Sequence, residues 1–428
     1  MRLRPLHPGQ ATPLTRPEHR PRRGARALER SPLPGSVTVR SYDRGDVETL
    51  SSVRLLHTSD WHVGRKIRGR SRAGEHRAVL TEIVDIARDH RVDVTVVAGD
   101  LFDISSPSPE DEEIVYRALL DLAEVGPVLV VGGNHDNPAR LEAVKPLLDL
   151  GRIRVVARAA APADGGLTVI ESLDLKIAFL PFVSQRGIVK ATEIMDLDPD
   201  QHAQGYEGRL RRIISALTES MGPDTVNILA GHLTVYGAEA GGGERESHIF
   251  GYAVPPQAFP GTLSYVALGH LHRQQRVPAS APVWYSGSPM QLDFGEVGDV
   301  KGVLLVEAEP AKPASVQPIA VEAGTRLVQL TGTLEQVLSR ASEGEGAYVK
   351  VLLDEKSRSG LNEEVREAIP GAVDVIIARP EDQAPRERVE RVGRSPVELL
   401  QAYLTAKGVD DPEVVELFRE LEQEVLSP

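Results

Sequence analysis

The chain contains no cysteine among its 428 residues. This absence excludes disulfide bonds and metal sites that depend on thiolates, such as structural zinc and iron–sulfur centres. Any metal ion must therefore be held by His, Asp, Glu or Asn side chains. The sequence also lacks a long uninterrupted apolar run, and its start lacks the apolar stretch of a secretory signal. We therefore expect a cytoplasmic protein with no membrane span.

The chain has no excess of positive charge, because its 62 Asp and Glu residues outnumber its 49 Lys and Arg residues and the formal net charge is −13 at pH 7. An acidic balance is unfavourable for binding DNA, since phosphate contacts come from Lys and Arg. The objection is small, because acidic metal ligands and an acidic C-terminal segment supply part of the excess, and a partner subunit can supply a basic surface. Residues 1–50 are instead rich in Arg and Pro, which predicts a disordered extension without a role in the chemistry.

From Val53 onward, short β-branched runs alternate with amphipathic stretches. The runs predict buried strands at 53–56, 92–98, 128–131, 177–182, 226–230, 265–268 and 302–306. Apolar residues at helical spacing predict helices around 79–86, 114–122 and 213–217. This alternation is typical of an α/β fold in which helices cover the faces of a sheet. We assign residues 53–309 to this first domain.

A linker-like break, Pro310-Ala311-Lys312-Pro313, follows the first domain. Residues 314–379 alternate strands (327–330, 348–353, 373–377) with helices (334–341, 361–369), which predicts a small α+β domain. After a polar stretch, residues 395–428 predict a helical hairpin, because Ser395 and Asp411 are each followed by proline at a helix start. The hairpin docks either on its own domain or on a partner helix. Its polar linker and terminal position favour the partner.

Metal-binding side chains follow several of the predicted strands. Asp60 and His62 are two residues apart, so in an extended segment both point to the same side and can share an ion. Asp100 is a carboxylate placed to bridge two cations about 3.5–4 Å apart. Asn134 and His232 add neutral ligands. The five motifs are Asp60-Trp61-His62, Gly99-Asp100, Gly133-Asn134-His135-Asp136, Gly231-His232 and Gly269-His270-Leu271-His272.

Each of these motifs alone is weak, because a single His or Gly-Asp at a strand end is more often an ordinary surface or turn residue. The ordered set is far less easily explained by coincidence, and it predicts a two-metal phosphoesterase site. His135 is a different case, since it follows the Asn ligand and precedes Asp136, whose carboxylate can fix its tautomer. We interpret His135 and Asp136 as catalytic, with His135 near the leaving oxygen. Asp103 and Glu239 receive no role.

The wider motifs carry a family resemblance. They read LHTSDWHVG (56–64), AGDLFD (98–103), GGNHD (132–136), AGHL (230–233), ALGHLH (267–272) and YSGSPMQ (285–291). With these flanks, the region from about 53 to 307 resembles the calcineurin-like metallophosphoesterases. More narrowly, it resembles the SbcD nuclease subunits of the bacterial SbcCD complexes. The leading 50 residues have no counterpart in that pattern.

The resemblance implies a two-sheet sandwich flanked by helices, a small capping domain, and C-terminal helices that bind the coiled coil of an SbcC-type ATPase. It implies two manganese ions, with magnesium as the alternative, and His135 as the catalytic histidine. The implied activity is cleavage of DNA, as a 3′–5′ exonuclease on duplex ends and an endonuclease on hairpins and single strands, in repair and recombination. A homodimer within a heterotetramer and a nucleoid-associated location are also implied. The implied metal ligands are Asp60, His62, Asp100 and His272 for one ion, and Asp100, Asn134, His232 and His270 for the other.

Two other functions remain open at this point. The same ligands would serve a phosphoesterase acting on phosphoproteins or small phosphate esters, because ligands set the reaction and not the substrate. The capping domain and terminal hairpin favour the nuclease, since a small-molecule phosphatase has little use for them. A structural tether with an inert site is the second alternative. It is disfavoured because all seven predicted ligands are present.

Overall fold

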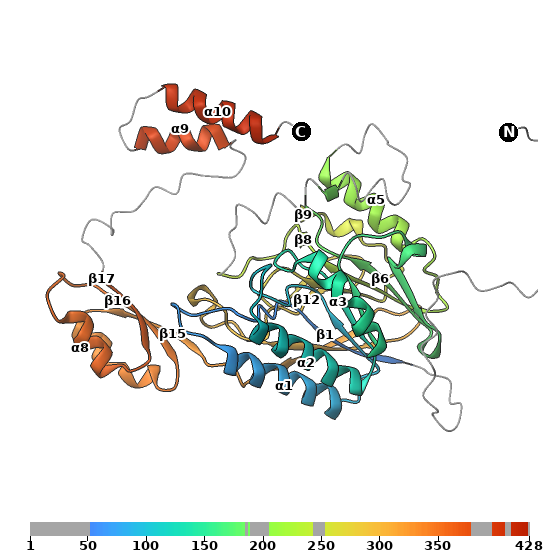
Figure 1. Cartoon of the computed structure of the whole chain (residues 1–428), viewed down its shortest axis with the longest axis horizontal. Coiled ribbons are helices and arrows are strands. Elements are labelled where there is room, and N and C mark those ends of the chain that lie inside the picture. Colours follow the sequence, from blue (N-terminus) through green and yellow to red (C-terminus); the bar gives the residue numbers. More distant parts are fainter. Residues whose placement is uncertain are drawn as a thin grey trace, which may run out of the picture.

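A computed structural model describes residues 52–184, 187–188, 205–242, 253–377, 396–406 and 412–426. The extension predicted at 1–50, the polar stretch 380–394 and the two predicted helix caps, Ser395 and Asp411, lie outside the described residues. Two six-stranded sheets, helices on their outer faces and a separate three-stranded sheet make up the fold (Figure 1). The predicted two-sheet α/β sandwich is confirmed. None of the helices in the described ranges combines the length and the apolar character that a membrane span requires.

The first sheet has the strand order β14-β13-β1-β2-β3-β4. Strands β1 to β4 are parallel, whereas β13 runs antiparallel to β1. In β1, Leu55 faces the second sheet and Leu56 faces the helices, so both sides of the strand are buried. The bounds are β1 Val53–Thr58, β2 Val94–Val97, β3 Val128–Val131, β4 Ile153–Val156, β13 Gly302–Ala308 and β14 Ser315–Ala320.

Helices α1 (Ala73–Asp89), α2 (Pro109–Val125) and α3 (Pro138–Leu150) cover the outer face of the first sheet. Helix α2 begins at a capping box, in which Ser108 accepts a hydrogen bond from the backbone of Asp111. Each of these helices presents apolar residues to one core cluster shared with the sheet. The helices predicted around 79–86 and 114–122 are therefore confirmed, as α1 and α2.

The second sheet has the order β11-β12-β10-β7-β6-β5. Its central strands β6, β7, β10 and β12 are parallel, and α5 (Tyr206–Thr218) covers its outer face. A short pair, β8 (Thr234–Val235) and β9 (Ala253–Val254), lies outside this sheet. The bounds are β5 Leu167–Ile170, β6 Leu175–Leu180, β7 Val226–His232, β10 Tyr265–Gly269, β11 Gln275–Val277 and β12 Val283–Tyr285.

The space between the two sheets is filled almost entirely by aliphatic and aromatic side chains from both inner faces. A polar pair lies in this core: His57 Nδ1 is 2.8 Å from the Tyr265 hydroxyl. Burial lowers the pKa of His57 to about 3, so this imidazole is neutral in the folded protein.

Strands β15 (Leu327–Gly332), β16 (Tyr348–Leu353) and β17 (Ala372–Ile377) form a parallel three-stranded sheet with its own core, covered by α7 (Leu334–Ser339) and α8 (Leu361–Ala368). The elements agree with those predicted for this part of the chain. Residues 310–313, predicted as the linker between two domains, instead connect β13 to β14. These two strands pair as a hairpin in the first sheet. The change from one sheet system to the other lies after β14.

A buried ion pair joins the three-stranded sheet to the sandwich. The Arg72 guanidinium is fully buried and lies 2.8 Å from the Glu75 carboxylate at the start of α1. Glu75 also accepts hydrogen bonds from the Tyr348 hydroxyl and the Thr325 backbone, at 2.9 and 3.2 Å. The two parts are thus connected through charged groups that depend on each other for pairing.

The chain ends in helices α9 (Pro396–Ala406) and α10 (Pro412–Leu426), which pack against each other as the predicted hairpin. Tyr403, Val414 and Leu417 are exposed on it, with fractional exposures of 58%, 39% and 56%.

Candidate metal centre

The predicted metal motifs lie at one edge of the sandwich, where strands of both sheets end. Strands β1, β2 and β3 are parallel, so the loops that follow them leave from the same edge. Hydrogen bonds connect the first two loops: the Asp60 amide donates to Gly99 O at 2.9 Å, and the His62 amide to Asp100 O at 3.1 Å. His232, at the end of β7, reaches this edge from the second sheet. Rigid strands thus position ligands that are far apart in sequence.

Several predicted ligands have an unusual backbone. Asp60 and Asp100 have φ of 53°, His62 has 45° and His270 has 103°. Non-glycine residues with such angles cost about 1–3 kcal/mol each, and they cluster at functional sites. Four of them at one edge indicate that the loops turn sharply to aim these side chains at a common point.

Two motif glycines leave room for the ligands. Gly99 has φ of +94°, and a Cβ there would collide with the His232 imidazole. At Gly133, a Cβ would overlap the carboxylate of Asp100. Glycine is therefore needed at both positions, because the side chain of another ligand packs directly against the backbone there.

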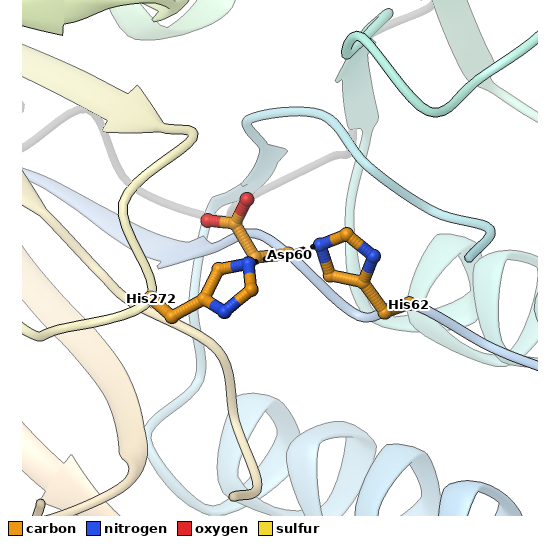
Figure 2. A group of neighbouring side chains, drawn as sticks. All are labelled: Asp60, His62 and His272. Carbon is orange, nitrogen blue, oxygen red and sulfur yellow. Dashed lines mark hydrogen bonds between the residues drawn. The ribbon is translucent and has the colours of Figure 1, made fainter. Parts of the chain in front are cut away.

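One group of ligands consists of Asp60, His62 and His272, whose ligand atoms all lie within 4.8 Å of one another. Figure 2 shows the two imidazoles pointing toward each other next to the carboxylate. The two Nε2 atoms are only 3.1 Å apart. His272 Nδ1 faces the Glu296 carboxylate at 2.9 Å, so its proton belongs on Nδ1 and its Nε2 lone pair faces the site.

A second group surrounds Asp100. Its Oδ2 lies 3.3 Å from His232 Nε2 and 3.6 Å from His62 Nε2, so this carboxylate stands between the two groups. Asn134 Oδ1 lies 3.0 Å from His232 Nε2 and 2.8 Å from His270 Nδ1. All seven predicted ligand side chains are thus brought together, and Asp100 has the central place expected of a bridging ligand.

Burial and mutual charge decide the protonation of this centre. Burial alone would raise the pKa of Asp100, but the neighbouring His232 and His62 outweigh it and hold that pKa far below the usual range. Burial would lower the pKa of His232, yet the Asp100 charge raises it to about 9. Burial, aided by repulsion from His232, lowers the pKa of His270 to about 3. An ionised carboxylate surrounded by imidazoles is an arrangement that a cation can stabilise by replacing the shared proton.

The donor set fits divalent cations. The ligands are carboxylate, amide and imidazole groups, and the protein has no thiolate. The Nε2 atoms of His62 and His272 face each other without a carboxylate between them. A cation bound by both nitrogen atoms would make this close approach favourable. His232 Nδ1 donates to Ala98 O at 2.8 Å, so Nε2, which faces Asp100 and Asn134, is the atom that would bind a cation. The Asp and His clusters, joined by Asp100, indicate a dinuclear metal site.

His135 lies beside this centre with its ring 4.7 Å from the His62 ring, measured between centroids. Its Nδ1 lies 2.6 Å from the Asp103 carbonyl oxygen, and its amide donates to Asp100 Oδ1 at 2.8 Å. A carbonyl only accepts, so Nδ1 carries the proton and Nε2 remains for a substrate.

Asp136 does not play the part predicted for it, because the Asp103 carbonyl fixes the tautomer of His135 instead. The Asp136 carboxylate accepts backbone hydrogen bonds from Leu101, Phe102 and Gly133, at 3.0, 3.2 and 2.9 Å. It therefore holds the loop after β2 to the loop after β3. Burial and the nearby Asp100 raise the pKa of Asp136 to about 6.

Two residues that contact the centre were not predicted from the sequence. Asp103, which received no role, also places its carboxylate 3.6 Å from His62 Nδ1. Glu296 lies outside every quoted motif yet contacts His272. Its only signal in sequence is its position five residues after the YSGSPMQ motif, whereas Glu239 remains an exposed residue paired with Arg273.

Comparison with known proteins identifies clear counterparts. Residues 53–274 match the calcineurin-like phosphoesterase family. The SbcD subunit of the SbcCD nuclease of Bacillus subtilis is 32% identical over 391 residues, covering 86% of this chain and 97% of that protein. The subunit of the same name from Escherichia coli K12 is 34% identical over 303 residues, covering 66% of this chain and 74% of that protein. The one from Rhodobacter capsulatus is 34% identical over 277 residues, covering 60% and 66%.

Proposed function

Because the chain belongs to the calcineurin-like phosphoesterase family and, within it, to the SbcD family of SbcCD nuclease subunits, we propose that it is the nuclease subunit of an SbcCD-type complex that processes DNA ends. The observation that carries this proposal is the convergence of seven nitrogen and oxygen ligands at one edge of the sandwich, with Asp100 between the two groups. Such a site suits hydrolysis of phosphodiester bonds. The similarity over nearly the whole Bacillus subtilis nuclease subunit supports a nucleic acid as substrate. We propose exonuclease action on duplex DNA ends and endonuclease action on hairpins or single strands.

We further propose that the centre holds two manganese ions, with magnesium as the alternative. Asp60, His62, Asp100 and His272 would hold one ion, and Asp100, Asn134, His232 and His270 the other. When bound, such a pair of ions supplies Lewis-acid activation of both water and the phosphate ester.

The chain's own residues complete the chemistry. The Asp103 carbonyl holds the Nδ1 proton of His135, so a second proton bound at Nε2 makes the ring an imidazolium that donates this Nε2 proton to the leaving oxygen and returns to the neutral Nδ1–H form. Asp136 keeps the His135 loop against the Asp100 loop through its three backbone hydrogen bonds. The half-buried position of His135 leaves it accessible to a DNA strand entering the centre.

The remaining parts of the chain are assigned to assembly. The three-stranded sheet with α7 and α8 would act as the capping domain, and the hairpin of α9 and α10 would bind the coiled coil of an SbcC-type ATPase. Its exposed Tyr403 and Leu417 are suited to a helical partner. Leu147 and Leu150 on α3 are 71% and 84% exposed, which supports pairing of two nuclease subunits within a heterotetramer. A cytoplasmic, nucleoid-associated location follows from a chromosomal DNA substrate.

A three-substrate assay tests the proposal. The full-length protein, with Mn²⁺ and an SbcC-type partner, is given linear duplex DNA, hairpin DNA and a small aryl phosphate. Cleavage of both DNA substrates is expected. Cleavage of the aryl phosphate alone would contradict the nuclease assignment. Removing residues 395–428 should abolish co-purification with the ATPase, and unchanged co-purification would refute the role of the hairpin.

A further inference from the structure

Two oppositely charged side chains enclose one of the predicted metal ligands. Glu296 ends the short 3-10 helix η6 (Phe294–Glu296) and is completely buried, and Lys301 precedes β13 and is also buried. Their charged groups are 2.8 Å apart. Neither lies in the motifs that predict the metal centre, yet both contact His272.

Glu296 contacts the His272 ring. Its Oε1 lies 2.9 Å from His272 Nδ1, and its Oε2 accepts from the Leu292 amide at 3.0 Å. Its ion pair with the Lys301 ammonium is that of a carboxylate, and a carboxylate facing the His272 ring accepts the Nδ1 proton.

Lys301 holds the main chain of the same ligand. Its Nζ donates to His272 O at 2.9 Å and to Ser288 Oγ at 2.9 Å, in addition to its pairing with Glu296. The ammonium group thus has three acceptors, which is the full number it can satisfy. Ring and backbone of His272 are fixed by two groups that also neutralise each other.

We propose that Glu296 and Lys301 form a positioning pair for His272, setting its tautomer and the direction of its Nε2 toward the metal centre. This inference rests on the proposed function of the centre. A carboxylate behind a metal-binding imidazole raises its basicity and strengthens it as a ligand. The paired lysine makes burial of that carboxylate tolerable, because an unpaired buried charge is costly.

The ligand histidines proposed for the other ion are supported differently. His232 donates its Nδ1 proton to the neutral carbonyl of Ala98, at 2.8 Å. His270 contacts Asn134 through Nδ1. Only the ion bound by His272 should therefore depend on Glu296, so loss of this carboxylate should weaken one metal site and leave the other unchanged.

Metal titration of the full-length, metal-free protein tests the pair. Calorimetry with Mn²⁺ should give two binding events for the wild type, and Glu296→Gln should weaken one of them by about 10–100-fold. The control is Glu239→Gln, the same change at a residue whose side chain is 73% exposed and pairs with Arg273 next to His272. That variant should bind both ions like the wild type.

A second variant separates positioning from simple charge pairing. Glu296→Gln leaves the Lys301 ammonium buried without its carboxylate, which can lower the unfolding temperature. In Glu296→Gln/Lys301→Met the unpaired charge is gone, so the unfolding temperature should recover while the weak metal site remains weak. Wild-type affinity at both sites in the double variant would overturn the inference. Fewer than two ions on the wild type would instead refute the proposed centre itself.

Discussion

Substitution of His135 by Asn separates catalysis from metal binding. The structure limits what this change removes: the amide of residue 135 still donates to Asp100, and none of the seven ligands is altered. The lost bond from Nδ1 to the Asp103 carbonyl is worth about 1 kcal/mol, or about fivefold in an equilibrium constant. A proton donor contributes about 10²–10⁴-fold to the rate, or about 3–5 kcal/mol. Turnover should therefore fall far more than manganese affinity.

The leaving group provides the sharpest form of this test. DNA cleavage releases a poor leaving group that needs a proton, whereas bis(p-nitrophenyl) phosphate releases a stable anion that does not. His135→Asn should lose about 10²–10⁴-fold in kcat on DNA and much less on the nitrophenyl ester. Single-turnover rates on both substrates, with Mn²⁺ at saturation, measure the difference. Equal losses on the two substrates, or full activity on DNA, would refute proton donation by His135.

Three further changes test other parts of the structure. Gly133→Ala should weaken Mn²⁺ binding, because the added Cβ would overlap the Asp100 carboxylate; wild-type affinity in a titration would argue against this packing. Arg72→Met should lower the free energy of unfolding by about 3–5 kcal/mol in urea, because Glu75 loses its buried partner, and a loss below about 1 kcal/mol would be inconsistent with the ion pair described. His57, whose pKa is about 3 when folded and ordinarily 6.5, binds its proton preferentially in the unfolded chain between these values, so stability should fall as pH decreases through this window. In metal-free protein, His57→Gln should reduce that slope by up to about 1.4 kcal/mol per pH unit, and an unchanged slope would mean that His57 is not neutral in the fold.

The sequence predicted the strands and ligands best where the signal is local. A buried parallel strand such as β3 is a continuous apolar run, and the turn after it is marked by Gly133 and Asn134. Edge strands carry a weaker signal. Strand β14 is largely exposed and contains Pro318, so its sequence resembles a linker, and only its pairing with β13 shows that it belongs to the first sheet.

The contacts behind the ligands were harder to predict. The partner of His135 is a backbone carbonyl, that of Asp103, and any residue type could supply a carbonyl. Adjacent positions suggested that Asp136 would take this part, but its side chain points at backbone amides of two loops. Glu296 reaches His272 because the fold brings two loops together, and its identity as a glutamate gave no indication of that neighbour.

Two metal ions that share Asp100 would be magnetically coupled, and electron paramagnetic resonance of the Mn²⁺-loaded protein measures this coupling. Two ions per chain with the signal of a spin-coupled pair are expected, because a carboxylate shared by two ions would hold them about 3.5–4 Å apart. Asp100→Asn should abolish the coupled signal. A single bound ion at saturating Mn²⁺, or two ions without magnetic coupling in the wild type, would contradict the shared-aspartate centre.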